Sequence, residues 1–362
     1  MPFKEYIKDF SDINSRSEFE EILSRSTHSF DLSQVYFSGV DLDWEKKEIR
    51  ESAYEKVGQY IAKQSQVLLA LWDGKENESI GGTASIINYK LNGIEDDKNS
   101  YENSLGQIEG GLVYHLLTPR KGDKNCDNAA TLKIYCPPFW KEVSQANIFY
   151  HKIFNSINTF NRDIIHFQNY LIKAKPLLNQ NLDELYKYLD IGGKSLFDHF
   201  NTTDYLAQRF KLFRTRALRL LLSFVVVAFA LFHIYLSIYP NIILLSLYPI
   251  LLAIGALIYW RAKRRGYEIK YEDYRSLSEA LRVQIFWNLN GNKENVSDYL
   301  LQKHKGELEW IKYALRNWTL EESIKPRINI EEKNKDKNVI CSLLASPELA
   351  LIGKITLSDY CG

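Results

Sequence analysis

Two long apolar runs, residues 220–238 and 241–260, constrain this chain more than any other feature. The first reads LLLSFVVVAFALFHIYLSI and the second NIILLSLYPILLAIGALIYW, and neither contains Lys, Arg, Asp or Glu. Across the whole 362-residue chain, by contrast, 25% of residues are charged. At about 1.5 Å of rise per residue, each run spans roughly 28–30 Å as a helix, close to the hydrocarbon thickness of a bilayer. The runs therefore predict a transmembrane hairpin over residues 217–260 rather than two buried helices of a soluble core.

Basic residues flank this hairpin, and only Tyr239 and Pro240 separate its two runs. The flanking residues are Arg209, Lys211, Arg214, Arg216 and Arg219 before the first run, and Arg261, Lys263, Arg264 and Arg265 after the second. Cationic clusters mark the cytoplasmic side of a membrane. We therefore expect two spans in the inner (cell) membrane, with both termini cytoplasmic. The N-terminal MPFKEYIKDF has no apolar h-region, so no cleavable signal peptide is expected.

Composition argues against several other classes of protein. The formal net charge of +1 argues against a general nucleic-acid binder, and membrane topology explains the basic flanks better. The four cysteines show no C-x-x-C spacing, so neither a zinc site nor a disulfide framework is indicated. No metal or cofactor is predicted. The predicted partners are the lipid bilayer and a small molecule, with further copies of the chain because two spans alone cannot enclose a pore.

The hairpin divides the chain into five expected segments. These are a cytoplasmic α/β domain (1–145), a helical connector (146–216), the transmembrane hairpin (217–260), a cytoplasmic helical pair (261–319) and a charged tail expected to be disordered (320–362).

The first segment carries the strand signals. Residues 66–72, QVLLALW, are apolar without alternation, as is typical of a parallel strand buried on both faces. A polar loop follows, a helix opens near residue 83, and further strands are expected at 112–118 and 132–136. Strand, glycine-opened helix and strand form a βαβ unit. We therefore expect a partial Rossmann-like parallel sheet, giving an α/β fold class.

Ligands of such sheets bind beyond the carboxyl ends of the strands. At that position the sequence places Asp73, Gly74, Gly81, Gly82 and Thr83. Glycines let the backbone approach a ligand, and a helix N-terminus offers N–H groups to a phosphate. Thr83 can donate a hydroxyl, and Asp73 can accept from a ribose hydroxyl. Ordinary turn chemistry, with Asp-Gly as a turn and Gly-Gly as a hinge, explains the same residues equally well.

The remaining segments read as helices. Residues 146–210 are expected to be helical, with a loop at Gly192-Gly193, and residues 203–210 are expected to lead into the first span as one continuous helix. Amphipathic helices are expected at 271–287 and 296–318, folding back on residues 146–210. Within the connector, a polar cluster is either functional or a solvated face; its members are Asn158, Phe160, Asn161, Arg162 and Asp163. Residues 321–337 read as linker or disorder.

With these elements placed, the chain resembles bacterial membrane proteins that carry a SLOG-type Rossmannoid domain, related to the nucleoside 2-deoxyribosyltransferases. The resemblance lies in Tyr6-x-x-Asp9-Phe10 with Arg16 and Phe19, in 70–86 (ALWDGKENESIGGTASI), in 113–119 (VYHLLTP), in the hairpin, and in 274–291 and 304–318. It implies a nucleotide-responsive membrane protein, because several SLOG proteins are proposed nucleotide sensors in bacterial conflict and immunity systems. Homo-oligomerisation of the hairpins would then be the effector step.

Three departures from that group bear on function. The N-terminal glycine loop that forms the first half of the ligand site is not found before residue 66. Ser85 and Ile86 stand where related transferases carry a carboxylate, so no catalytic residue is assigned and a non-enzymatic sensor is favoured. After Trp318 the resemblance ends. A membrane-bound nucleoside hydrolase or transferase using Asp73, and an oligomeric channel-like protein, are the alternatives.

Overall fold

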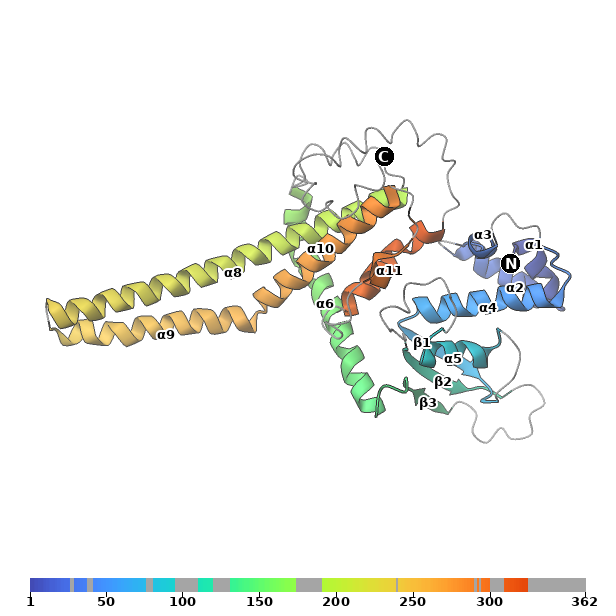
Figure 1. The fold of residues 1–362 in the computed structure, drawn as a ribbon, viewed down its shortest axis with the longest axis horizontal. Helices are drawn as coiled ribbons and strands as arrows, with labels where there is room; N and C mark the ends of the chain where they lie inside the picture. Colours follow the sequence, from blue (N-terminus) through green and yellow to red (C-terminus); the bar gives the residue numbers. More distant parts are fainter. Residues whose placement is uncertain are drawn as a thin grey trace, which may run out of the picture. The chain divides into compact units, whose positions relative to one another are not determined.

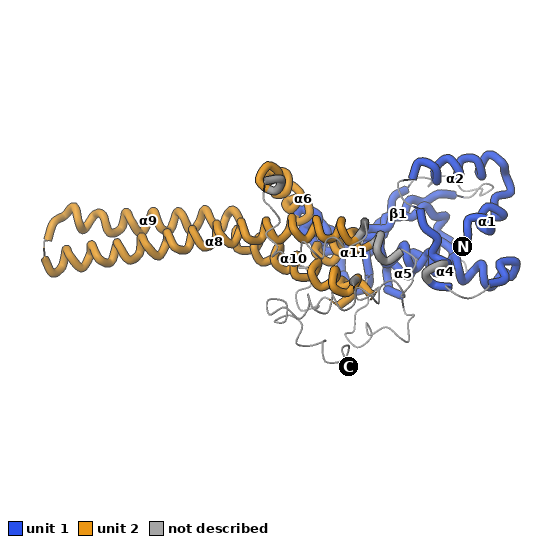
Figure 2. Tube along the Cα trace, turned by 90° about the horizontal axis from the view of Figure 1, so that it is seen from above, with its two compact units in different colours: residues 1–155, 320–339 blue, residues 156–319, 340–362 orange. Residues whose placement is uncertain are grey.

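The protein is mostly helical, with one small mixed sheet and two long apolar helices. A computed structural model describes residues 1–26, 29–37, 42–75, 81–94, 110–119, 131–173, 191–238, 240–289, 292, 294–299 and 309–324. Two compact units divide the chain: unit 1 comprises residues 1–155 and 320–339, and unit 2 comprises residues 156–319 and 340–362 (Figure 2). Each unit is described by itself below.

Unit 1 combines short N-terminal helices with a three-stranded sheet (Figure 1). In chain order its elements are α1 (Phe3–Tyr6), a 3₁₀ turn η1 (Ile7–Asp9), α2 (Ile13–Arg25), α3 (Ser33–Tyr36), α4 (Lys47–Gln64), β1 (Val67–Trp72), α5 (Thr83–Asn92), β2 (Leu112–Leu117) and β3 (Leu132–Tyr135). The ring of Phe19 packs against those of Phe3, Tyr6 and Phe10, and this contact holds α2 to the first turns of the chain.

The sheet has the order β1-β2-β3. β1 and β2 are parallel, with Val67 opposite Leu112 and Trp72 opposite Leu117, and α5 connects them along the chain. The predicted βαβ unit is therefore confirmed. The expectation of a wholly parallel sheet is wrong, because β3 pairs with β2 in the antiparallel sense, with Val113 opposite Tyr135. Antiparallel neighbours need no helical crossover between them.

One face of the sheet is covered by α5. Ala70, Ile87 and Val113 are buried together, and Leu68, Trp72, Leu91 and Tyr135 pack around them. On the other face, the side chains of Leu69 and Leu71 are 67% and 60% exposed. The expectation that β1 is buried on both faces is therefore wrong. The strand is apolar on both sides, but α5 lies over only one of them.

Unit 2 is built from long helices. They are α6 (Val143–Lys173, which begins in unit 1), α8 (Ile191–Ser237), α9 (Ile242–Arg264), α10 (Tyr267–Leu289), a 3₁₀ turn η3 (Val296–Tyr299) and α11 (Glu309–Ile324). The predicted continuation of residues 203–210 into the first span is confirmed, because α8 is one helix of 47 residues. The loop expected at Gly192-Gly193 is wrong, because both glycines lie in the first turn of α8. The helix expected over 296–318 is a 3₁₀ turn followed by α11, with residues 300–308 outside the described part. Residues 320–324, expected in the tail, are helical.

The apolar runs form an antiparallel hairpin of α8 and α9. Gly255 is buried at their contact, where a Cβ atom would lie 3.3 Å from Leu221 Cδ1 and 3.6 Å from Phe224 Cβ. Nearer the tip, the Tyr248 ring lies 5.1 Å from that of Phe232. A small residue at the contact lets two helices approach closely. Both helices are long and apolar enough to cross a membrane, as the sequence predicts.

A left-handed glycine separates α9 from α10. Gly266 has φ +63°, and the N–H of Gly266 donates to the carbonyl of Lys263, which closes the end of α9. A residue with a Cβ would be strained at this φ. α10 begins at Tyr267, before the expected residue 271, and packs along α8. The predicted fold-back of the later helices is confirmed.

Candidate functional site

The five residues predicted to bind a ligand lie at the carboxyl end of β1 and at the start of α5. Asp73 and Gly74 follow β1 directly, and Gly82 is the N-cap of α5 with extended backbone (φ −73°, ψ 168°). Gly82 has no side chain to cap the helix, so the first N–H groups of α5 depend on other partners. Thr83 is exposed at the first helical position. The residues that join the two parts, 76–80, lie outside the described part of the chain.

Gly74 and Gly81 share a backbone conformation but differ in how closely other atoms approach them. Gly74 and Gly81 both have φ +78°, where residues other than glycine are strained. A Cβ on Gly81 would lie 2.8 Å from the backbone N of Glu55 and 3.0 Å from the backbone carbon of Tyr54, both in α4. At Gly74 the nearest atom, Leu117 Cδ1, lies 3.4 Å away. The close approach that requires a glycine at residue 81 is therefore an approach to α4.

Asp73 takes part in turn chemistry. Its Oδ1 accepts a hydrogen bond from the backbone N–H of Lys75 at 3.1 Å, which is the pattern of an Asx turn. This contact supports the turn interpretation of Asp73 and Gly74. Ligand binding by the five residues stays a prediction.

The α4 residues beside Gly81 form hydrogen bonds with Asp9 of the N-terminal region and with Tyr89 of α5. Asp9 accepts hydrogen bonds from the Tyr54 hydroxyl and from the Arg50 guanidinium. Burial, followed by the bond to the Asp9 carboxylate, raises the pKa of Tyr54 well above its usual value. Nearby, the Tyr89 hydroxyl of α5 donates to Glu55 Oε1 at 2.6 Å. The Tyr6-x-x-Asp9-Phe10 motif is thus joined to the helix that packs on Gly81, which spacing alone did not indicate.

A second polar centre lies in unit 2, where α6 meets α10. The Asp163 carboxylate receives the Lys270 ammonium at 2.9 Å (Oδ1) and 2.7 Å (Oδ2), and it receives the Tyr274 hydroxyl at 2.6 Å. Tyr274 is only 2% exposed. The buried ring of Phe160 lies 5.2 Å from that of Tyr274 and 5.6 Å from that of Trp310. Within the polar cluster singled out from the sequence, Asp163 and Phe160 are therefore parts of a helical core.

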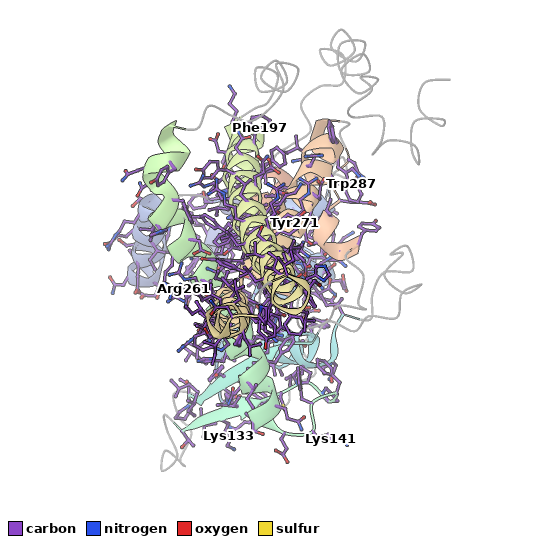
Figure 3. The ribbon with its side chains drawn as sticks, turned by 90° about the vertical axis from the view of Figure 1, so that its left-hand side faces the viewer. Lys133, Lys141, Phe197, Arg261, Tyr271 and Trp287 are labelled. Atoms are coloured by element: carbon purple, nitrogen blue, oxygen red, sulfur yellow. The ribbon has the colours of Figure 1, made fainter. Side chains whose placement is uncertain are left out.

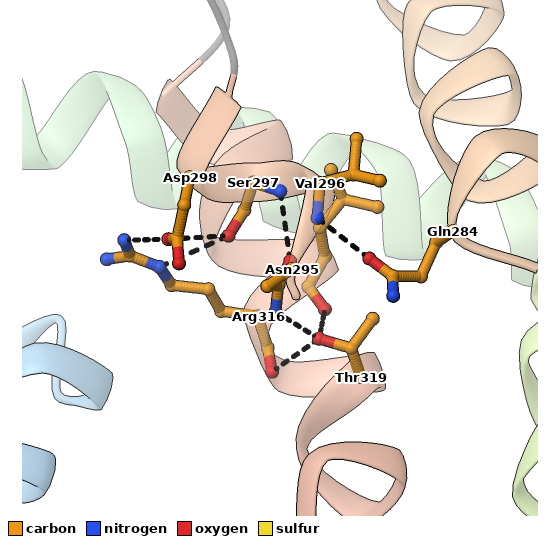
Figure 4. Close-up of polar contacts among 8 residues, drawn as sticks. Gln284, Asn295, Val296, Ser297, Asp298, Arg316 and Thr319 are labelled. Atoms are coloured by element: carbon orange, nitrogen blue, oxygen red, sulfur yellow. Dashed lines mark hydrogen bonds and ion pairs between the residues drawn. The ribbon is translucent and has the colours of Figure 1, made fainter. Parts of the chain in front are cut away.

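Arg316 holds a further network in unit 2 (Figure 4). Its guanidinium donates to Asp298 Oδ1 at 2.7 Å and to Ser297 Oγ at 3.3 Å, and its side chain is only 5% exposed. Gln284 Oε1 accepts the backbone N–H of Val296 at 2.8 Å. These bonds tie η3 to both α10 and α11. The sequence contains no periodic signal for them, because the partners come from separate elements.

His199 of α8 and Trp318 of α11 form a parallel stack. Their ring centroids are 4.2 Å apart and their planes differ by 9°. Burial lowers the pKa of His199, and the neighbouring Asp198 carboxylate opposes this shift. His199 lies well before the first apolar run, outside the expected spans.

This stack predicts a pH dependence. Since the pKa of His199 is lower in the folded than in the unfolded chain, the unfolded state binds more protons below about pH 6.5. Stability is therefore complete above that pH and falls as the pH drops towards the folded pKa. We expect the unfolding midpoint, followed by tryptophan fluorescence, to fall on acidification from pH 7.5 to 5.5. In His199→Phe the fall should be smaller, and an unchanged fall would contradict the assignment.

No group of three or more His, Cys, Asp or Glu side chains is placed to hold a metal ion in the described part of the chain.

Comparison of the chain with protein-family models, with curated proteins and with solved structures gave no match.

Proposed function

We propose that the protein is a membrane-anchored sensor of a nucleotide-type ligand, whose α8–α9 hairpin is its output element in a bacterial defence or conflict system. The resemblance to SLOG-type membrane proteins supports the ligand class and the setting. The βαβ unit with its glycine-opened helix supports the position of the ligand at Asp73, Gly74, Gly81, Gly82 and Thr83.

The observation that carries this proposal is the continuity of α8. In its first turns the side chains of Leu196, Phe200 and Leu206 are buried among the helices of unit 2. In its last turns it carries the first apolar run, with Val226 66% exposed and Leu236 64% exposed. One helix is therefore a core element of unit 2 at one end and, in the proposed function, a membrane span at the other. A change in the packing of that core reaches the membrane without a joint between them.

The basic flanks support the orientation. Arg219 and Arg261 lie at the two ends of the hairpin that are distant from its tip, and positively charged flanks remain in the cytoplasm. The protein would then have two spans in the cell membrane with both soluble parts inside, where nucleotide signals arise.

Ligand capture would use the carboxyl end of β1. The N–H groups at the start of α5 and the helix dipole favour a phosphate at Gly82 and Thr83. In this proposal the Asp73 carboxylate accepts a hydrogen bond from a ribose hydroxyl.

Binding of a nucleotide panel to the full chain in detergent tests the input. We expect one member to bind, and Asp73→Ala to weaken it by about tenfold or more, because a hydrogen bond to a charged group contributes about 1.5–3 kcal/mol. Gly82→Val should also weaken it, by placing a side chain at the approach to α5. Asp12→Ala is the control, since the Asp12 carboxylate also accepts a backbone N–H, that of Ser15, but at the N-cap of α2 and outside the proposed ligand site.

Chemical cross-linking in vesicles tests the output. The bound nucleotide is expected to change the proportion of cross-linked oligomers, and Asp73→Ala should abolish the change. If no nucleotide binds, the sensor function is refuted; if one binds and the oligomers stay unchanged, the hairpin is only an anchor.

A further inference from the structure

Eight exposed cations surround the base of the hairpin. This basic collar consists of Lys211, Arg214, Arg216 and Arg219 on α8, and Arg261, Lys263, Arg264 and Arg265 at the end of α9. Figure 3 shows the hairpin nearly end-on, with Arg261 labelled on α9. Helix geometry, at about 100° per residue, points these side chains in several directions around both helices. The cations therefore form a ring rather than one pocket.

The two halves of the collar lie at the same level along the hairpin. Arg214 donates to Glu268 Oε1 at 2.7 Å, and Leu221 lies against Gly255. These two contacts fix the antiparallel register. Arg216 and Arg219 must consequently lie level with the end of α9, where the other four cations follow one another.

Acidic groups do little to neutralise the collar. The sequence holds no Asp or Glu from residue 205 to residue 267. Glu268 pairs with Arg214, and both side chains are exposed, at 62% and 44%. Arg219, Arg261 and Lys263 have no acidic partner within the described residues. A ring of cations with so little compensation attracts anions from outside the chain.

Exposed aromatic rings place the collar at the edge of a membrane. Tyr259 and Trp260 are 54% and 56% exposed at the end of the second apolar run. The guanidinium of Arg264 lies 5.2 Å from the centroid of the Trp260 ring. Exposed Trp and Tyr next to an apolar span occupy the headgroup region of a bilayer. The neighbouring cations then lie at the depth of the phosphate groups.

We propose that the basic collar binds the phosphate groups of anionic phospholipids in the leaflet that faces the cytoplasm. The inference rests on the membrane insertion of the proposed function and adds the identity of the lipid partner. Because the collar surrounds both helices, it recruits several headgroups at once. The shared chemistry is that of a phosphate anion, and the depth set by Trp260 assigns it to lipid rather than to free phosphate.

Quenching of Trp260 by brominated lipids measures the preference directly. The full chain is reconstituted in phosphatidylcholine vesicles, brominated phosphatidylglycerol or brominated phosphatidylcholine is titrated in, and the signal of Trp260→Phe is subtracted. A favourable interaction of about 1 kcal/mol for each cation near an anionic surface gives a preference for phosphatidylglycerol of about fivefold or more. The preference should decrease as salt is raised.

Two matched variants separate the collar from general charge. Arg219→Gln, Arg261→Gln and Lys263→Gln together should clearly lower the preference, because they remove three of the eight cations of the collar. Lys47→Gln, Lys133→Gln and Lys141→Gln remove the same charge from exposed positions of unit 1 and should leave the preference unchanged. Equal losses in both variants would overturn the proposal, because charge anywhere on the chain would then suffice.

Two further experiments distinguish lipid binding from the binding of free phosphate, and collar function from membrane insertion. Inorganic phosphate at the concentration of the lipid phosphate should not reduce the preference; if it removes the preference, the collar binds free anions and the lipid assignment is wrong. Flotation with pure phosphatidylcholine vesicles tests insertion alone. A chain that does not float refutes the membrane function itself, whereas a chain that floats without preferring phosphatidylglycerol refutes only the collar.

Discussion

Asp163→Ala is expected to lower the unfolding midpoint of unit 2 by about 10 °C, from a loss of about 3 kcal/mol. The substitution leaves the Lys270 ammonium and the buried Tyr274 hydroxyl without the carboxylate that now receives both. Removing one partner of a buried ion pair costs about 3–5 kcal/mol, and we expect the lower end because Lys270 is 22% exposed. Fluorescence of Trp310, which packs against Phe160 and Tyr274, reports the unfolding.

Two control variants test whether the loss of stability comes from the buried ion pair. Asp163→Asn keeps an acceptor for the Tyr274 hydroxyl and should lose less stability than Asp163→Ala. Glu268→Ala breaks an ion pair of similar length with Arg214, but both side chains are exposed, so a loss of at most about 1 kcal/mol is expected. Equal losses in Asp163→Ala and Glu268→Ala would show that the α6–α10 contact does not depend on a buried charge pair.

Gly81→Ala should destabilise unit 1 more than any other glycine-to-alanine change near the proposed ligand site. The φ of +78° costs about 1–2 kcal/mol for a residue with a Cβ. The Cβ would also lie 2.8 Å from the backbone N of Glu55, and relieving such overpacking costs about 1–3 kcal/mol more. Thermal unfolding followed by circular dichroism measures the sum.

Gly74→Ala is the matched control. Gly74 has the same φ, but the nearest atom to its Cβ position is a leucine methyl at 3.4 Å, an ordinary contact. We therefore expect Gly74→Ala to cost about 1–2 kcal/mol only. If both variants lose the same stability, α4 yields to the added methyl group, and the close approach at Gly81 is not a structural requirement.

The strongest local signals in the sequence correctly indicated the elements. The apolar runs identified the hairpin because length and absence of charge are properties of one segment. The β1–β2 pair and α5 followed from apolar strands and a glycine-opened helix for the same reason. By contrast, whether a face of the sheet is buried depends on which other elements pack against it. The apolar sequence of β1 therefore did not reveal that Leu69 and Leu71 are exposed.

Long-range pairs could not be found in this way. Asp163 belongs to the polar cluster singled out from the sequence, but its partner Lys270 lies 107 residues away and no local signal marks it. Lys90 of α5 is only 6% exposed, and its ammonium donates to the carbonyl of Ala62 in α4 at 3.1 Å, a contact between separate helices that no local pattern indicates. The Gly81-Gly82 motif was visible in the sequence. Gly81 is needed because the backbone of α4 packs close to it, and no local sequence pattern indicates that contact.

In the proposed function, the unbroken α8 would also act as a lever. Its 47 residues extend for about 70 Å, so a tilt of about 5° at its buried end would move its far end by about 6 Å. A displacement of that size is comparable to half the diameter of a helix. Rearrangements of the core too small to alter its secondary structure would thus be magnified into a change of neighbours in the far leaflet.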